Sequence, residues 1–401
     1  MQVKTKIGRR SFLKSSAVAG SGLVLGFSWL AGCQPGAMDP EDLPEEWFAI
    51  NAYLKIGSNG LVTIVSPNPE GGQNVKTSMP MIVADELDVD WNQVIVEQAP
   101  LNTDAFTRQF IGGSQAIRQS WQGLRMAGAS ARYMLRQAAA QAWQVPLDEV
   151  TTHEGVLYHE GSGKSATYGD LANAAAKIPV PQEVTLKDIK DFGIIGTSRK
   201  NVDGLKIVTG QPLFGIDVQQ EGMLIAMIVH PPAFGMKLKS ADVDGVTKLP
   251  GIRDVFSFKS MQDDYERQYF DTVTFTDLVA IVGQSTWEVM NAKKALRVEW
   301  EAIADTTVPV DRFGQKQTIT IPAGLEGTAS HQELIAAAAA KPGNIRRKDG
   351  DPDRAFRQAA KVIERTYSAP FLAHNCMEPM NFFAHVNDGQ ARLRGPLQKP
   401  E

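Results

Sequence analysis

The stretch from Pro69 to Asp90, which reads PEGGQNVKTSMPMIVADELDVD, decides how the N-terminal part of the chain folds. Two glycines and Gln73 open it, and apolar residues then recur at close to helical spacing, at Met79, Ile82, Val83 and Leu87. A glycine turn before a helix lets the backbone approach a ligand, and the first helical N–H groups have no partner within the helix. Because the helix dipole also favours an anion there, the stretch predicts either a site for phosphate or a similar anion, or a plain glycine-rich turn into a surface helix.

A second segment repeats this pattern of a loop followed by a helix. The polar connection 102–119 contains Ile111-Gly112-Gly113-Ser114-Gln115, and a strong helix is predicted over 121–143. Its apolar face consists of Leu124, Ala127, Ala131, Met134, Leu135, Ala138 and Ala142. We interpret the loop either as a second ligand-contacting segment or as the cap of the long helix.

Length and composition limit the number of domains and exclude some classes of function. The 401 residues suffice for two or three domains, and a formal net charge of −4 gives no basic footprint for nucleic acid. The two cysteines, Cys33 and Cys376, are too few for an iron–sulfur cluster, which takes about four thiolates. They also make no disulfide framework.

Four motifs carry a family resemblance. The segment 70–77 resembles the glycine–glutamine–glycine segment of the molybdenum hydroxylases, and Gly113-Ser114 resembles their Gly-Gly-Ser segment. AHNCMEP at 373–379 is similar to the family signature alanine–histidine–x–x–methionine–glutamate–proline, and Gln398 resembles a glutamine beside the molybdenum. By these motifs the chain is identified as a member of the molybdopterin-binding large subunits of the xanthine dehydrogenase and aldehyde oxidase family, most similar to the isoquinoline 1-oxidoreductase beta subunits. Asn74 stands where the family usually has Gly, and Asn is the next best residue for a left-handed backbone.

The resemblance implies a cofactor, a substrate class and partners. The cofactor is the molybdenum cofactor, molybdopterin in its mononucleotide or cytosine dinucleotide form, contacted by Gly72, Gln73, Gly113, Ser114 and Gln398. Glu70 and Thr77 are weaker candidates that could serve as helix caps. The implied substrates are N-heteroaromatics or aldehydes, oxidised with oxygen from water. Electrons would pass to two-iron two-sulfur clusters of a separate small subunit, with a cytochrome c as acceptor.

The first 33 residues are interpreted as an export signal. Arg9 and Arg10 lie in GRRSFLK, which resembles a twin-arginine signal, and the apolar run 15–30 is too short and glycine-rich for a good membrane-spanning helix. Leu30-Ala31-Gly32-Cys33 fits a lipobox, whose Cys33 would carry a lipid anchor; ordinary signal cleavage that leaves a soluble protein is the alternative. Both alternatives predict a periplasmic protein.

The remaining chain is divided into five parts, and the fold class is α+β. They are a linker over 34–45, an N-terminal molybdopterin-binding portion over 46–200, an α/β hammerhead domain over 201–302, a connector over 303–352 and the start of a second molybdopterin-binding portion over 353–401. A β-hairpin is predicted over 53–67, strands over 94–96, 278–282 and 362–367, and helices over 286–296, 332–340 and 353–360.

The resemblance also predicts what the chain lacks. The family's glycine-rich phenylalanine loop and its catalytic Glu, a general base, are expected beyond Glu401, so we assign no catalytic residue and expect an N-terminal fragment that is inactive and poorly soluble alone. One alternative is a non-catalytic exported lipoprotein that keeps the fold as a binding module. Another is a phosphate-dependent enzyme that uses the glycine turn for a nucleotide.

Two further patterns resemble binding motifs but are interpreted otherwise. Gly161-Ser162-Gly163-Lys164-Ser165 looks like the tail of a phosphate-binding loop, but Tyr158 stands where such a loop needs Gly, so a hairpin turn is predicted. His374, Cys376 and Glu378 would share one face of a strand and suggest zinc, a weak alternative to the family signature.

Overall fold

The computed structural model describes residues 4–6, 43–106, 108–262, 265–268, 277–323, 327–370, 372 and 375–400. The twin-arginine pair, Cys33 and His374 lie outside the described residues. The chain divides into two compact units. The first comprises 1–218 together with 374–401, and the second comprises 219–373.

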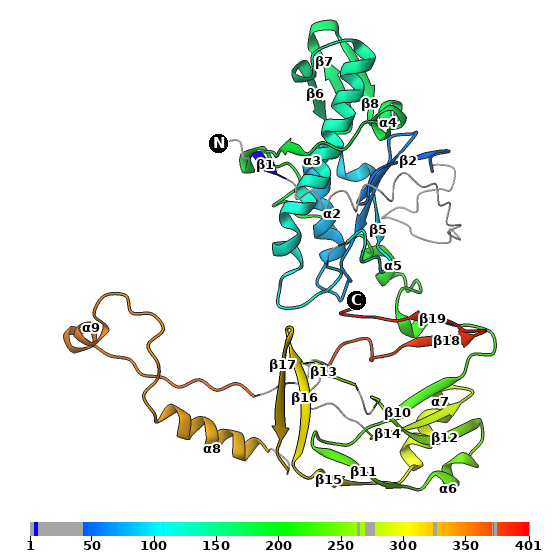
Figure 1. The fold of residues 1–401 in the computed structure, drawn as a ribbon, viewed down its shortest axis with the longest axis vertical. Coiled ribbons are helices and arrows are strands. Elements are labelled where there is room, and N and C mark those ends of the chain that lie inside the picture. Colours follow the sequence, from blue (N-terminus) through cyan, green and yellow to red (C-terminus); the bar gives the residue numbers. More distant parts are fainter. Residues whose placement is uncertain are drawn as a thin grey trace. The chain divides into compact units, whose positions relative to one another are not determined.

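A four-stranded sheet organises the first unit (Figure 1). Its order is β2-β3-β4-β5, formed by Trp47–Asn51, Leu54–Gly57, Val62–Ser66 and Val94–Gln98. The predicted hairpin is confirmed, because β3 and β4 pair antiparallel around a turn in which Gly60 has a φ of 88°. In contrast, β4 and β5 run parallel, with Val62 opposite Val94.

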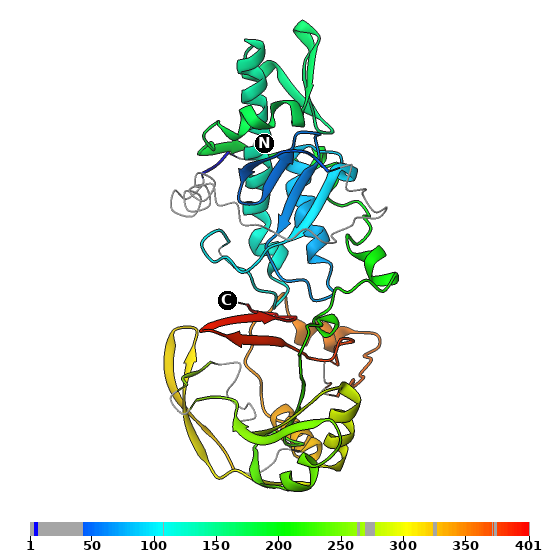
Figure 2. The same cartoon turned by 90° about the vertical axis from the view of Figure 1, so that its right-hand side faces the viewer.

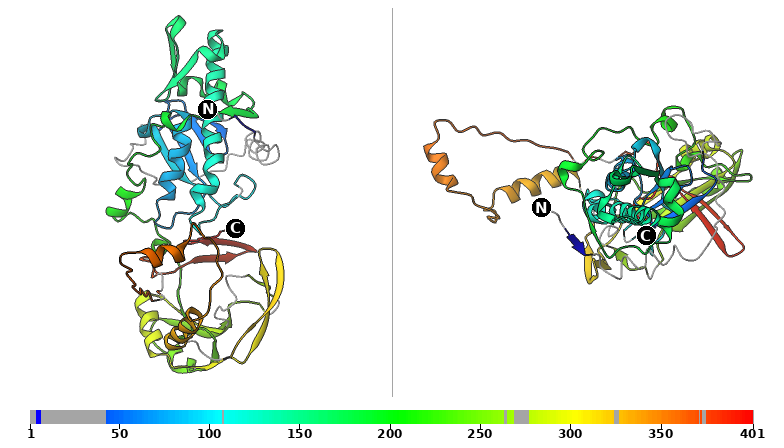
Figure 3. Two further views of the ribbon diagram at one scale, coloured as in Figure 1. Left: turned by 90° about the vertical axis from the view of Figure 1, so that its left-hand side faces the viewer. Right: turned by 90° about the horizontal axis from the view of Figure 1, so that it is seen from above.

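Two helices cover one face of this sheet (Figures 2 and 3). Helix α2, Val75–Leu87, is the crossover between β4 and β5 that a parallel pair requires. Helix α3, Ala116–Trp143, begins five residues before the predicted start at Trp121. The two helices bury Met79, Val83, Leu124 and Leu135 with the sheet in one hydrophobic core.

The rest of the first unit is built from short elements. A three-stranded antiparallel sheet comprises β6 (Val150–His153), β7 (Val156–His159) and β8 (Lys164–Thr167), which confirms the hairpin turn predicted at 161–165. Helix α4 spans Tyr168–Ala176 and α5 spans Gly204–Val208. Strand β9 (Glu183–Thr185) pairs with β1 (Lys4–Lys6), and β18 (Phe383–Asn387) pairs with β19 (Gln390–Arg394). Short 3-10 turns occur at Trp91–Gln93, Leu147–Glu149, Glu160–Ser162, Ile189–Asp191 and Gly215–Asp217.

The second unit has its own small core, around Val255, Val279, Ile281 and Val289. Its sheet has the order β10-β14-β12, formed by Ile225–Val229, Asp277–Gly283 and Ile252–Lys259, and α7 (Thr286–Ala295) packs on it. Further strands are β11 (Met236–Ala241), β13 (Arg267–Gln268), β15 (Val298–Ala302), β16 (Thr306–Arg312) and β17 (Gln315–Ile321). Further helices are α6 (Val243–Thr247), α8 (Thr328–Ala339) and α9 (Pro352–Gln358). Helices and strands mix without strict alternation, which confirms the α+β class.

One predicted strand is wrong. Residues 362–367 form no strand, and every residue from 341 to 370 is exposed. The β-branched pattern there has no neighbouring strand to pair with among the described residues, and an isolated strand is not stable. Residues 375–378 are not a strand either, so the one-face arrangement proposed for a zinc site is not formed in the described part of this segment.

Candidate functional site

The candidate site begins where two parallel strands end. Because β4 and β5 run parallel, the loops 67–74 and 99–115 leave the sheet at the same edge. In sheets with parallel strands this carboxyl edge is the usual place for a ligand. Both glycine-containing segments singled out in the sequence lie on these two loops.

Backbone conformation explains the glycines of the first loop. Gly72 has a φ of 93°, a value that favours glycine, and a Cβ atom there would meet nothing within 4 Å. Asn74 has a φ of 64° and adopts the left-handed conformation expected of a residue that replaces glycine. The loop therefore presents exposed backbone at residues 71–74.

The anion at the start of α2 is the protein's own Glu70. Its Oε1 accepts hydrogen bonds from the amides of Gly72 at 2.7 Å and Asn74 at 3.0 Å, and its Oε2 accepts one from Lys76 at 2.8 Å. The capping role considered for Glu70 is confirmed, and these three amides are not open to an external phosphate. These three amides therefore fit the alternative of a plain glycine-rich turn that leads into the helix.

Gln73 holds the same loop in shape. Its Oε1 accepts from the Gly71 amide at 2.7 Å, and its Nε2 donates to the Pro69 carbonyl at 3.3 Å. Its own backbone amide takes part in no hydrogen bond of the described residues. In this conformation, Gln73 can meet a ligand through its amide, while its side chain shapes the loop.

The second loop presents a row of backbone amides. Gly113 and Ser114 have φ values of 58° and 56°, and the Gln115 amide donates to the Gly112 carbonyl at 3.2 Å. These are the features of a type I′ turn. In the described part of the chain, the amides of Gly112, Gly113 and Ser114 donate to no protein acceptor. Consecutive free amides of this kind form a binding concavity for anionic oxygen atoms.

Ile111 brings all three predicted segments together. Its amide donates to the Gln398 carbonyl at 3.0 Å, and a Cβ atom placed on Gly71 would lie 2.9 Å from its Cδ1. Gln398 is exposed and joins the site through its backbone. Segments around residues 71, 111 and 398 therefore converge within the first unit, which periodicity alone could not establish.

Three side-chain amides, which the sequence reasoning missed, fix the loops to one another. Asn68 Nδ2 donates to the Phe110 carbonyl at 2.7 Å, and Gln98 Nε2 donates to the Asn68 carbonyl at 2.9 Å. Gln109 Nε2 donates to the carbonyls of Pro67 at 3.1 Å and Pro100 at 2.7 Å. Asn68 is 1% exposed, and its Oδ1 has no partner. The signal available in the sequence was the position of Asn68 and Gln98 at the ends of the two strands, whereas Gln109 gave no such signal.

An ion-pair cluster anchors residues 201–206 at the start of α2. Asp203 pairs with Lys76 through one carboxylate oxygen and with Lys206 at 3.2 Å through the other, while the Val202 amide donates to Thr77 Oγ1 at 3.1 Å. Burial alone would raise the pKa of Asp203, but the hydrogen bonds and charges of the two lysines outweigh it, so its pKa is lowered. Thr77 thus holds a neighbouring segment and does not cap its own helix.

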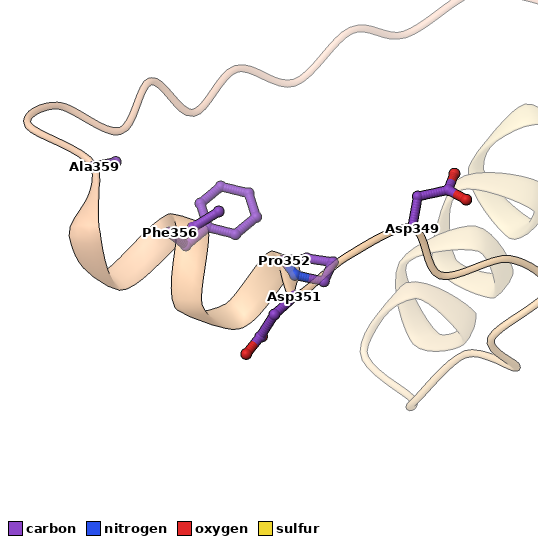
Figure 4. A pocket seen from close by; sticks show the side chains of 6 residues that line it. Asp349, Asp351, Pro352, Phe356 and Ala359 are labelled. Carbon is purple, nitrogen blue, oxygen red and sulfur yellow. The ribbon is translucent and has the colours of Figure 1, made fainter.

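Other candidate features lie elsewhere. No group of His, Cys, Asp and Glu among the described residues could hold a metal ion. The carboxylate of Glu378 accepts from the Ile216 amide at 3.2 Å and from Asn381 at 2.7 Å, and Cys376 is an exposed free thiol. A hollow beside α9, shown in Figure 4, is lined by Asp349, Asp351, Pro352, Ala355, Phe356 and Ala359. The carboxylates of its two aspartates point in different directions, so they do not form a shared polar site.

Comparison with known proteins identifies the family. The family described as "Molybdopterin cofactor-binding domain" matches residues 4–204, which include both glycine loops. The chain belongs to this family. The predicted relationship to molybdopterin-binding subunits of the xanthine dehydrogenase and aldehyde oxidase family is confirmed.

Curated relatives of this molybdopterin-binding chain are oxidoreductases. It is 32% identical to the beta subunit of isoquinoline 1-oxidoreductase from Brevundimonas diminuta, over 64% of this chain and 36% of the relative. It is 25% identical to a membrane-bound aldehyde dehydrogenase (pyrroloquinoline-quinone) of Gluconacetobacter polyoxogenes, over 96% of this chain and 47% of the relative. The large molybdopterin subunit of nicotinate dehydrogenase from Eubacterium barkeri is 24% identical over 53% of this chain and 49% of the relative.

The molybdopterin-binding chain thus matches less than half the length of each of these relatives. No helix among its described residues is long and apolar enough to cross a membrane.

Proposed function

We propose that this chain is the cofactor-binding part of a molybdenum hydroxylase that oxidises N-heteroaromatic compounds or aldehydes, with water as the oxygen source. The observation that carries the proposal is the convergence of three loops, at residues 71–74, 111–114 and 398, beside the carboxyl edge of a parallel strand pair. The substrate class follows the names of the relatives, which are an isoquinoline oxidoreductase, an aldehyde dehydrogenase and a nicotinate dehydrogenase.

The residues of the edge fit an anionic cofactor. Molybdopterin carries phosphate and many hydrogen-bonding groups, and the four amides of residues 73 and 112–114 have no protein acceptor among the described residues. Oδ1 of Asn68, buried without a partner, lies on the same pair of loops and adds an acceptor. We assign cofactor contacts to Gly72, where the absence of a side chain lets a ligand approach the backbone, and to Gln73, Gly113, Ser114 and Gln398. The bound cofactor would supply the oxygen-transfer and redox chemistry.

The electron route and the location are further parts of the proposal. Two cysteines are too few for a cluster, so electrons would pass to a small subunit that holds two-iron two-sulfur clusters, and from there to a cytochrome c. Arg9 and Arg10 support export by the twin-arginine route to the periplasm, and Cys33 supports a lipid anchor there. We propose the cytosine dinucleotide form of the cofactor.

Cofactor content tests the proposal directly. The full chain is produced with its signal in a molybdenum-replete host, and molybdenum and released cytidine nucleotide are measured per chain by mass spectrometry. We expect both near one per chain. Gly113→Ala, which strains a left-handed turn in the site, should lower the molybdenum content about tenfold, a loss of about 1.4 kcal/mol.

A matched control separates the site from general strain. Gly163 has a φ of 67° in the exposed turn between β7 and β8, so Gly163→Ala imposes similar strain outside the site. It should keep the molybdenum content of the unchanged chain. A folded chain with no molybdenum, or equal losses in both variants, would contradict the assignment.

A further inference from the structure

Three side chains on strand β7 and on the turns beside the small β6-β7-β8 sheet form a connected line of hydrogen bonds. His159 Nε2 lies 2.8 Å from Glu149 Oε2, and His159 Nδ1 lies 2.7 Å from Ser162 Oγ. His159 is 5% exposed, whereas Ser162 is exposed. A carboxylate, an imidazole and a hydroxyl in this order are the parts of an activated serine nucleophile.

Strand register produces this arrangement. Val150 at the start of β6 is paired with His159 at the end of β7, which places the preceding Glu149 beside the imidazole. A 3-10 turn, Glu160–Ser162, then returns the chain so that Ser162 faces the other ring nitrogen. Because these residues are brought together by a hairpin and a tight turn, their geometry is set by rigid local elements.

Hydrogen bonding fixes the tautomer of His159. The backbone amide of Ser162 donates to Nδ1 at 3.2 Å, and only an unprotonated nitrogen can accept it. The proton of the neutral ring is therefore on Nε2, where it is donated to the Glu149 carboxylate. Unprotonated Nδ1 also lies 2.7 Å from Ser162 Oγ, so its lone pair is shared between the amide and the hydroxyl of Ser162, and the hydroxyl proton can pass to it.

The serine is accessible from solvent. Its neighbours are Gly161 and Gly163, so no adjacent side chain covers it, and a Cβ atom on Gly163 would meet nothing within 4 Å. The motif that looks like the tail of a phosphate-binding loop thus presents a hydroxyl on a histidine base, at the end of a hairpin.

We propose that Ser162, His159 and Glu149 form a second reactive site, a serine nucleophile that accepts acyl groups from small activated esters. Oγ of Ser162 attacks the ester carbonyl carbon while its proton passes to Nδ1 of His159. The C–O bond to the alcohol then breaks, the alcohol leaves with that proton, and an acyl-serine remains. Water repeats the sequence and releases the acid. The site is separate from the cofactor loops and needs no metal or redox partner.

A phosphonofluoridate probe tests the proposal on the full chain. The probe forms a phosphorus–oxygen bond to an activated serine and releases fluoride, and peptide mass spectrometry locates the label. We expect one label per chain, on Ser162, and a burst of about one p-nitrophenol per chain with p-nitrophenyl acetate. Ser162→Ala should abolish both signals. His159→Gln should slow labelling by about 10²-fold, the lower end of general-base effects.

Two further variants keep the test decisive. Glu149→Gln removes the charge that orients the imidazole and should slow labelling while the thermal unfolding temperature stays close to that of the unchanged chain. Ser58, exposed in the turn between β3 and β4, has no histidine partner among the described residues, so Ser58→Ala should label as fast as the unchanged chain. Labelling of Ser162 no faster than that of Ser58 would overturn the proposal, as would an unchanged rate in Glu149→Gln. In either case, His159 would only hold the turn.

Discussion

Single carboxylates determine much of the local geometry of this chain. Glu70 occupies the start of α2 and accepts three backbone amides, so it fills the place that the sequence pattern offered to an external anion. Asp85 of α2, which is 1% exposed, accepts hydrogen bonds from the amides of Ile194 and Ile195 at 2.9 and 2.8 Å. It thereby holds this distant segment against α2. In both cases a charged acceptor satisfies amides that would otherwise lack a partner.

The pH dependence of stability should report on Asp203. Its pKa is lowered in the folded chain, so its contribution is present above the ordinary value of 3.8 and is lost as the pH falls through the folded value. Asp203→Asn leaves Lys76 and Lys206 without their shared partner and should cost about 1–3 kcal/mol at neutral pH.

Denaturant unfolding of both proteins between pH 7 and pH 2 measures this effect. The stability difference should be constant near neutrality and should shrink below pH 3.8. A difference that persists unchanged at pH 2 would show that the carboxylate charge contributes nothing.

At the scale of elements, the close crossing of α2 and α3 shapes the first unit. A Cβ atom on Gly128 of α3 would lie 2.3 Å from the Val83 carbonyl and 2.8 Å from Glu86 Cβ on α2. Next to this contact, Glu86 is fully buried and forms an ion pair with Arg125 at 2.6 Å. Burial, the largest effect, raises the pKa of Glu86, although the two neighbouring arginines act against it.

Two glycines of α3 should respond to alanine in opposite directions. Gly128→Ala forces the helices apart and should lower the free energy of unfolding by about 1–3 kcal/mol. Gly123→Ala is the matched control, because a Cβ atom there would meet nothing within 4 Å. It should stabilise the chain by up to about 1 kcal/mol, through helix propensity. Chemical denaturation measures both, and equal effects would refute the close-packing argument.

At the scale of the whole molecule, the two units differ in how much core they bury. The first unit has a large cluster around the four-stranded sheet, whereas the second has a small one. The segment 341–370 buries none of its residues, and within it Ile345 is 80% and Tyr367 is 90% exposed. Large exposed apolar side chains of this kind favour association with other surfaces.

Limited proteolysis should therefore begin in this segment. It contains the trypsin sites Arg346, Arg347, Lys348, Lys361 and Arg365, which lie outside α9 on exposed chain with few hydrogen bonds. The first fragments of the full chain, identified by mass spectrometry, should end at these residues. Arg132 and Arg136 lie on α3 against the core and should be cut last. Early cleavage in α3 would contradict this order of stability.

The sequence by itself determined the features that depend on neighbours along the chain. Turn glycines such as Gly72, the hairpin around Gly60 and the apolar period of α3 are local, because backbone sterics and helical spacing act within a few residues. The family motifs also lie within short segments. Local reasoning failed where a strand had no partner to pair with, at 362–367.

Only the tertiary structure decided which of these local features meet. The parallel pairing of β4 with β5 aligns the two glycine loops, and Ile111 joins them to Gln398, nearly 300 residues further along. The same is true of Ser162, whose motif at 161–165 resembles part of a phosphate-binding loop. Only strand register shows that His159 lies beside Ser162 and that the Glu149 carboxylate lies beside His159. The physical reason is that hydrogen bonds and packing between distant segments depend on how the chain folds back on itself. Sequence periodicity reports only on neighbours along the chain, so it does not show which distant segments come into contact.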